Sequence, residues 1–303
     1  MATWAYPPLP PDQLNREADS ALARELEWLL QSLQDSLVAL KEGLQECAAL
    51  LAPEEPGSTL VLSSLRSENV KGFVTRVGTK VVKGDIHLRL PSLPTPRGQP
   101  STRLTLSQAP GLVLQQLVSV RNLVNQSLDI VDVSTYTGNP LDATFIFSQL
   151  HLLHETISEA RHMLKGEGTC EATGGIPTFD PATPPYVSFH LSIADSALVL
   201  LLRTLESTTF VATPTAFATD ISLTGFSLRD RIFGSRQRVH DEAGDVFMWH
   251  GEEVRVKEKI RVESQDPSLM AVMAKLTALE HEVMRWVGAL RVLMGNEDTE
   301  SES

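Results

Sequence analysis

The chain has 303 residues, of which 42% are hydrophobic, and it carries a formal net charge of −12 with a pI near 5.1. A chain of this length buries one large core or two modest ones. The acidic balance excludes a protein whose main task is to grip nucleic acid, because that task needs a basic surface. The only two cysteines, Cys47 and Cys170, exclude a disulfide framework and a cysteine zinc site, and they favour a reducing compartment.

The first half of the chain is predicted to begin with a long helix. Residues 1–11 are proline-rich and predict a loop, and 12–52 then carry apolar side chains at steps of three and four. The members of this stripe are Leu26, Leu29, Leu33, Leu37, Leu40, Leu44, Cys47 and Leu51. An uneven step at Leu33 and the helix-weakening Gly43 favour a bundle helix over an extended coiled coil.

A change of period marks the next segments. Residues 58–91 alternate apolar and polar side chains and predict strands, whereas the proline-rich 92–110 predict a loop. Helical spacing returns over 111–166, with a break at T-G-N-P (137–140). The glycine-rich 167–185 predict a further loop.

The last third of the chain is predicted to hold strands and one more helix. Residues 186–264 alternate as strands, with a hairpin through A-D-S (194–196) and a long loop over 206–243. Asp266 is the predicted N-cap of a helix over 266–295, and Pro267 suits its first position. The acidic 296–303 predict a disordered tail.

This order of elements predicts an α+β fold in which a bundle of about four helices packs beside an antiparallel β-sheet domain. The bundle comprises 12–52, 111–166 and 266–295, and the β domain comprises 58–91 and 186–264. The helices do not alternate with single strands, which excludes a series of βαβ units. The longest apolar run, 197–202, is too short to cross a membrane, and the N-terminus lacks the features of a signal peptide, so a cytoplasmic protein is expected.

Few residues of the chain fall in patterns typical of catalytic or metal sites. His151, Glu155 and His162 lie on the polar face of one predicted helix, but His162 is about 10 Å beyond Glu155 along the axis, too far to share an ion with the other two. The glycines near 166–168 lack the spacing of a dinucleotide loop, and Cys170 has no basic neighbourhood. The sequence therefore predicts no metal, no cofactor and no enzymatic activity.

The stretch F-M-W-H-G-E-E-V-R-V (247–256) has an alternative interpretation as the corner of an active site built from His250, Glu252 and Glu253. The flanking alternation instead favours a hairpin whose turn needs a positive φ at Gly251. Two adjacent carboxylates in a strand point to opposite faces and cannot act as an acid–base pair. The enzyme interpretation is therefore the weakest.

Two basic features contrast with the acidic composition. Arg255, Lys257, Lys259 and Arg261 alternate with other residues and are expected on one strand face, roughly 6–7 Å apart. This face is either a solvated edge that opposes aggregation or a docking strip for an acidic partner or an anionic membrane. The second feature surrounds Ile232 and Phe233 and consists of Arg229, Arg231, Arg236 and Arg238. It is either a solvated loop, a partner-binding motif, or a phosphorylation site at Ser235.

Several of these blocks, taken in order, resemble the Rogdi family. They are E-L-E-W-L-L (25–30), N-V-K-G-F-V-T-R-V-G (69–78), D-I-H-L-R-L-P (85–91), L-Q-Q-L-V-S-V-R-N-L-V (114–124) and F-M-W-H-G-E-E-V-R-V (247–256). The fungal members of this family are the Rogdi-like subunit of RAVE, the regulator of the proton ATPase of vacuolar and endosomal membranes. The segments 91–110, 166–185 and 206–243 do not match.

The resemblance implies an elongated, non-catalytic subunit without cofactors. Its implied partners are a large WD-repeat (rabconnectin-like) scaffold, a Skp-type adaptor and subunits of the vacuolar proton ATPase, whose two sectors the complex helps to join. It also implies a cytoplasmic protein recruited to vacuolar and endosomal membranes. Association with the membrane is then only peripheral, and the alternative function is an adaptor that binds anionic lipid through the basic strand.

Overall fold

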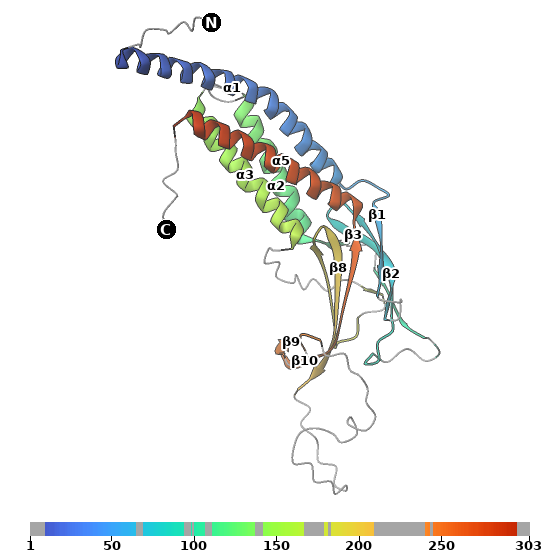
Figure 1. The fold of residues 1–303 in the computed structure, drawn as a ribbon. Helices are drawn as coiled ribbons and strands as arrows, with labels where there is room; N and C mark the ends of the chain where they lie inside the picture. Colours follow the sequence, from blue (N-terminus) through green and yellow to red (C-terminus); the bar gives the residue numbers. More distant parts are fainter. Residues whose placement is uncertain are drawn as a thin grey trace, which may run out of the picture.

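The computed structural model describes residues 10–64, 69–93, 98, 100–106, 111–136, 142–166, 179–180, 183–208, 240–242 and 245–295. Within these residues it contains four α-helices and two antiparallel sheets, which confirms the α+β class. The molecule is elongated, with the helical bundle at one end and both sheets at the other (Figure 1). One continuous core of buried side chains runs from the bundle into both sheets.

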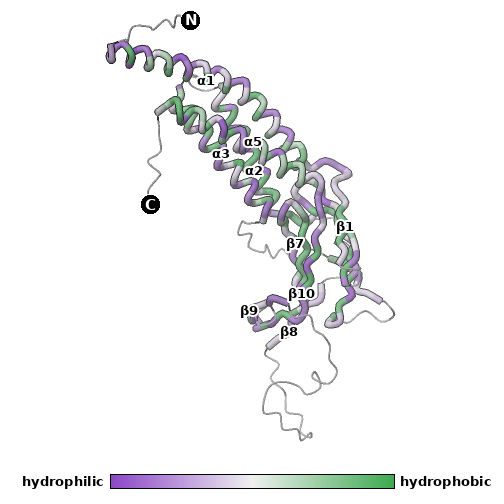
Figure 2. The backbone as a smooth tube through the Cα atoms, in the orientation of Figure 1, coloured by the Kyte–Doolittle hydropathy of each residue, from purple (hydrophilic) through white to green (hydrophobic). Residues whose placement is uncertain are grey.

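The bundle follows the predicted helices closely. Its members are α1 (Pro11–Leu50), α2 (Gln115–Tyr136), α3 (Ala143–Lys165) and α5 (Pro267–Leu293). Helix α1 packs on α2 and α5, and α3 packs on α2 and α5. Hydrophobic and hydrophilic residues alternate around each helix (Figure 2), as expected where one side faces a core.

Gly43 of α1 lies against Leu279 of α5. A Cβ atom added there would lie 2.7 Å from Cδ2 of Leu279, so the missing side chain makes room for this leucine. The same residue weakens the helix slightly, as the sequence indicated. Packing between helices therefore explains a glycine that local helix propensity disfavours.

The predicted stripe of α1 is buried only in part. Leu29 and all later members are buried, whereas Leu26 is half-buried and most side chains of residues 11–28 are exposed. This segment, called the α1 overhang below, extends beyond the ends of the other helices (Figure 1).

The first sheet has six strands, and three of them were not predicted from the sequence. Its path runs β1 (Ser58–Ser63), β2 (Val70–Val77), β3 (Lys80–Leu88), β4 (Thr102–Leu106) and β6 (Phe179–Asp180), and β5 (Leu112–Val113) pairs with β3. The predictions of loops over 92–110 and 167–185, and of a helix from residue 111, were therefore wrong at β4, β6 and β5. These strands are short, and pairing with β3 and β4 rather than a long local pattern defines them.

The second sheet has the order β7 (Val187–Ala194), β8 (Ala197–Ser207), β10 (Glu252–Gln265) and β9 (Val246–Trp249). The predicted hairpin between β7 and β8 is confirmed, with Asp195 and Ser196 at φ 48° and 60°. Strand β8 continues two residues into the range predicted as a loop. Ser92 links the two sheets, because its hydroxyl donates to Thr204 Oγ1 at 2.9 Å and contacts Glu258 Oε2 at 2.5 Å.

Candidate interaction surfaces

His250, Glu252 and Glu253 lie in the β9–β10 hairpin, as the flanking alternation predicted. His250 and Gly251 form the two-residue turn with φ 50° and 87°, as predicted for Gly251. Glu252 pairs with Trp249 and Glu253 with Met248, so the two carboxylates point to opposite faces. The Trp249 indole N–H donates to the Pro185 carbonyl at 3.1 Å.

A β-bulge interrupts the basic strand at Lys257. Val256 pairs with Leu205 and Glu258 with Thr204, so Lys257 is the extra residue in β10. An extra residue reverses the alternation that follows it. Arg255 therefore lies on one face of the sheet, and Lys259 and Arg261 lie on the other. The expectation that all four cations share a face was wrong for this reason.

Three of the four cations are already engaged in ion pairs. Their partners, in N···O distances, are Glu206 for Arg255 (3.0 Å), Asp241 and Glu242 for Lys259 (2.7 Å each) and Glu263 for Arg261 (2.7 Å). Lys257 is exposed and forms no ion pair with the described residues, although its carbonyl lies 3.3 Å from His240 Nε2. The available positive charge of this strand is thus much smaller than its sequence suggests.

Glu242 is the centre of a charge network on the second sheet. Arg203 Nε and Nη2 donate to its two carboxylate oxygens at 2.6 and 2.9 Å, and Lys259 Nζ donates to it at 2.7 Å. The hydrogen bonds from Arg203, aided by Lys259, lower the pKa of Glu242 to about 2. Although burial alone would lower the pKa of Lys259, its hydrogen bonds to Asp241 and Glu242 raise it.

Replacing Glu242 by glutamine is expected to change how stability depends on pH. The folded-state pKa of about 2 lies below the ordinary value of 4.5 for a glutamate, so ionised Glu242 stabilises the fold above about pH 4.5 and loses this effect as the pH falls towards 2. Urea unfolding at a series of pH values should show Glu242→Gln less stable than wild type at pH 6, with the difference shrinking in acid. Glu252→Gln, at the exposed turn, is the matched control and should follow wild type. A pH-independent difference would contradict the assigned role of the carboxylate.

Polar side chains of α3 make contacts both within the helix and to α5. His151 packs edge-on against Phe147 with ring centroids 4.5 Å apart. Glu280 of α5 pairs with Arg161 and lies 3.8 Å from His154 Nε2. In the described part of the chain, no three His, Cys, Asp or Glu side chains gather closely enough to hold a metal ion. Cys170, Ser235 and the arginines 229–238 lie outside the described residues.

Two exposed surfaces with apolar side chains were not predicted from the sequence. The first is the α1 overhang, whose exposed apolar side chains include Leu14, Leu22 and Trp28, with 56%, 46% and 67% of their areas exposed. The predicted apolar stripe began only at Leu26, so the sequence did not mark these exposed side chains as a surface. The second is the outer face of the first sheet, where Val61 and Phe73 lie beside several cations. In the sequence, this face was indicated only by the alternation of apolar and polar residues over 69–91.

Together these features describe an α+β protein with an exposed apolar helix end and an exposed sheet face that carries cations. Within the residues that the structure describes, none of the helices is both long and apolar enough to cross a membrane. The model of the family described as Rogdi leucine zipper containing protein matches residues 25–291, and the chain belongs to this family. It is also similar to "Regulator of V-ATPase in vacuolar membrane protein 2" of Schizosaccharomyces pombe. The two are 22% identical over 277 residues, covering 87% of this chain and 91% of that protein.

Proposed function

We propose that this protein is a non-catalytic subunit of a RAVE-like complex that promotes assembly of the peripheral and membrane sectors of the vacuolar proton ATPase. The family match over 25–291 carries this proposal. The similar protein of Schizosaccharomyces pombe supports it, because that protein is named a regulator of the V-ATPase. The proposed partners are a large WD-repeat (rabconnectin-like) scaffold, a Skp-type adaptor and ATPase subunits. The protein would act in the cytoplasm and be recruited to vacuolar and endosomal membranes.

The α1 overhang supports a role as a scaffold. Leu22 and the half-buried Leu26 continue, at helical spacing, the stripe whose later members pack in the bundle. A partner helix laid along the overhang would extend the bundle without moving any described element. Leu22, 46% exposed, is the natural anchor of this contact, because it lies on the same side of α1 as the stripe, whereas Trp28 points to the other side.

Affinity purification tests this proposal directly. The tagged wild-type chain should recover a WD-repeat protein and proton-ATPase subunits, and Leu14→Glu with Leu22→Glu should lose the WD-repeat protein. Val38→Glu is the matched control, since Val38 is 54% exposed on the covered half of the same helix. Recovery of neither partner class by the wild-type chain would refute the assembly role. Recovery by the double variant would refute only the overhang as the contact.

The alternative function is a peripheral adaptor that binds anionic lipid through β10. The ion pairs of Arg255, Lys259 and Arg261 weaken this alternative, because they leave Lys257 as the strand's main available cation. Flotation with phosphatidylserine vesicles distinguishes the two functions. Binding that is lost in Lys257→Glu would favour the lipid adaptor.

A further inference from the structure

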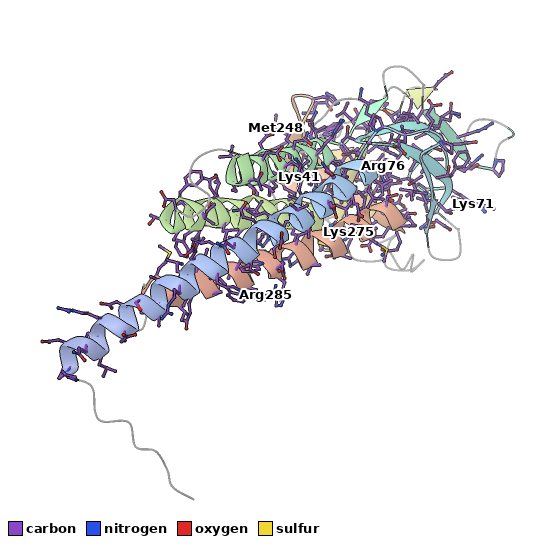
Figure 3. All side chains as sticks on the ribbon, turned by 90° about the horizontal axis from the view of Figure 1, so that it is seen from above. Lys41, Lys71, Arg76, Met248, Lys275 and Arg285 are labelled. Carbon is purple, nitrogen blue, oxygen red and sulfur yellow. The ribbon has the colours of Figure 1, made fainter. Side chains whose placement is uncertain are left out.

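The outer face of the first sheet forms a recess lined by cations. A hollow of about 880 Å³ lies over β1, β2 and β3, at the end of the molecule far from the tip of α1, where Lys71 is labelled in Figure 3. The residues that matter here, called the basic hollow below, are Val61, Lys71, Phe73, Asp85, His87 and Arg89.

Strand register aligns these side chains in two rows. Inward-facing neighbours such as Val70, Val74 and Ile86 are buried in the core, so the residues between them face outward. One row crosses the sheet as Ser63, Lys71, His87 and Arg103, and the next as Val61, Phe73, Asp85 and Thr105. A cationic row therefore lies directly beside an exposed apolar pair.

The charges of the hollow are not balanced internally. Arg103 donates to both oxygens of Asp85 at 2.8 and 2.6 Å, and these hydrogen bonds lower the pKa of Asp85. Both oxygens of Asp85 are therefore engaged by Arg103 and do not neutralise Lys71 or Arg89. Lys71 and Arg89 form no ion pair with the described residues, although the chain as a whole carries a charge of −12. An anion entering the hollow meets two cations that no described carboxylate neutralises.

The apolar pair limits the kind of ligand. Val61 and Phe73 are 65% and 41% exposed on the same face as the cations. A free anion would leave them uncovered, and a flat bilayer cannot follow a recessed surface. A polypeptide in extended form supplies both chemistries, because its alternate side chains reach separate positions on a sheet face.

We propose that the basic hollow binds a short acidic segment of a partner protein. An acidic side chain lies between Lys71 and Arg89, and an apolar side chain of the same segment covers Phe73 and Val61. This proposal rests on the proposed scaffold function and specifies the acidic and apolar side chains by which one partner would be recognised. Its test uses the purified chain alone, so its failure would leave the assembly role untouched.

Fluorescence anisotropy against an array of acidic peptides tests this inference. The peptides carry glutamate and aspartate at varied spacing around one leucine or phenylalanine, and matched peptides replace the acids by lysine or the apolar residue by serine. We expect the acidic–apolar peptides to bind, both replacements to weaken binding, and added salt to weaken it further. No binder in the array, or equal binding of the lysine peptides, would overturn the proposal.

Substitutions locate the contact. Lys71→Glu with Arg89→Glu is expected to weaken binding about tenfold or more, since like charges oppose each other across the contact. Both side chains are exposed, and an unchanged circular dichroism melt confirms that the variant folds. Arg255→Glu with Lys257→Glu makes the same charge change at exposed positions of the second sheet and should leave binding unchanged. Undiminished binding by the double variant would overturn the site. Phosphatidylserine vesicles provide the last comparison. If they bind as tightly as the peptides, and this binding also requires Lys71 and Arg89, a peptide is not the specific ligand of the hollow and the proposal is overturned.

Discussion

Replacing Asp266 by alanine is expected to lower the free energy of unfolding by about 3–5 kcal/mol, because the change leaves a buried cation without its partner. Asp266 Oδ2 pairs with Arg76 Nε at 2.6 Å, and their side chains are 0% and 3% exposed. Its other oxygen accepts from the Ser268 and Leu269 amides at 3.0 and 3.4 Å, which caps α5. One carboxylate thus starts a helix of the bundle and fixes it to strand β2.

Chemical unfolding of three variants separates these two roles. Asp266→Asn keeps an acceptor for the helix amides and loses the charge, so it should still destabilise the protein, although less than Asp266→Ala. Adding Arg76→Met to Asp266→Ala removes the unpaired cation and should recover part of the loss. A loss near 1 kcal/mol in Asp266→Ala would mean that only the cap contributes.

Gln116→Ala is expected to destabilise the protein by about 2–4 kcal/mol, because two buried backbone groups lose their partners. The Gln116 amide donates to the Ile193 carbonyl at 3.0 Å and accepts from the Ile193 N–H at 2.7 Å. β7 is an edge strand of its sheet, so these groups of Ile193 have no neighbouring strand. The side chain at the start of α2 thus replaces a strand at this edge.

Gln115→Ala is the matched control for this prediction. Gln115 is the exposed neighbour of the buried Gln116, so the same chemical change should leave the unfolding midpoint almost unaltered. Hydrogen exchange should show faster exchange of the Ile193 amide in Gln116→Ala than in Gln115→Ala. Equal midpoints for the two variants would show that solvent replaces the bonds without loss.

The leucine repeat of α1 agrees with the leucine zipper in the family's description. Its later leucines pack against helices of the same chain. Leu33, Leu37, Leu40 and Leu44 are buried in the bundle core, where α1 meets α2 and α5. Within α1, the apolar positions that continue this leucine repeat are exposed or half-buried only in the α1 overhang, at Leu22 and Leu26. Under the proposed scaffold function, a partner that contacts α1 is therefore expected at its first half.

The sequence by itself determined the features that depend on near neighbours. Helical spacing identified the four helices, Asp266 and Pro267 marked the start of α5, and positive φ requirements located the turn at Gly251. These features involve residues a few positions apart, so their energetics can be read from a short window. The expected separation of Glu252 and Glu253 follows from the same local rule.

Only the tertiary structure decided which distant residues meet. Arg76 and Asp266 are 190 positions apart, and no local pattern predicts that a helix cap also neutralises a buried cation. The bulge at Lys257, the strand β4 and the ion pairs around Glu242 likewise depend on which strand or segment lies alongside. Local sequence limits each segment to a few conformations, but packing between segments sets burial and charge balance, and these define the surfaces available to a partner.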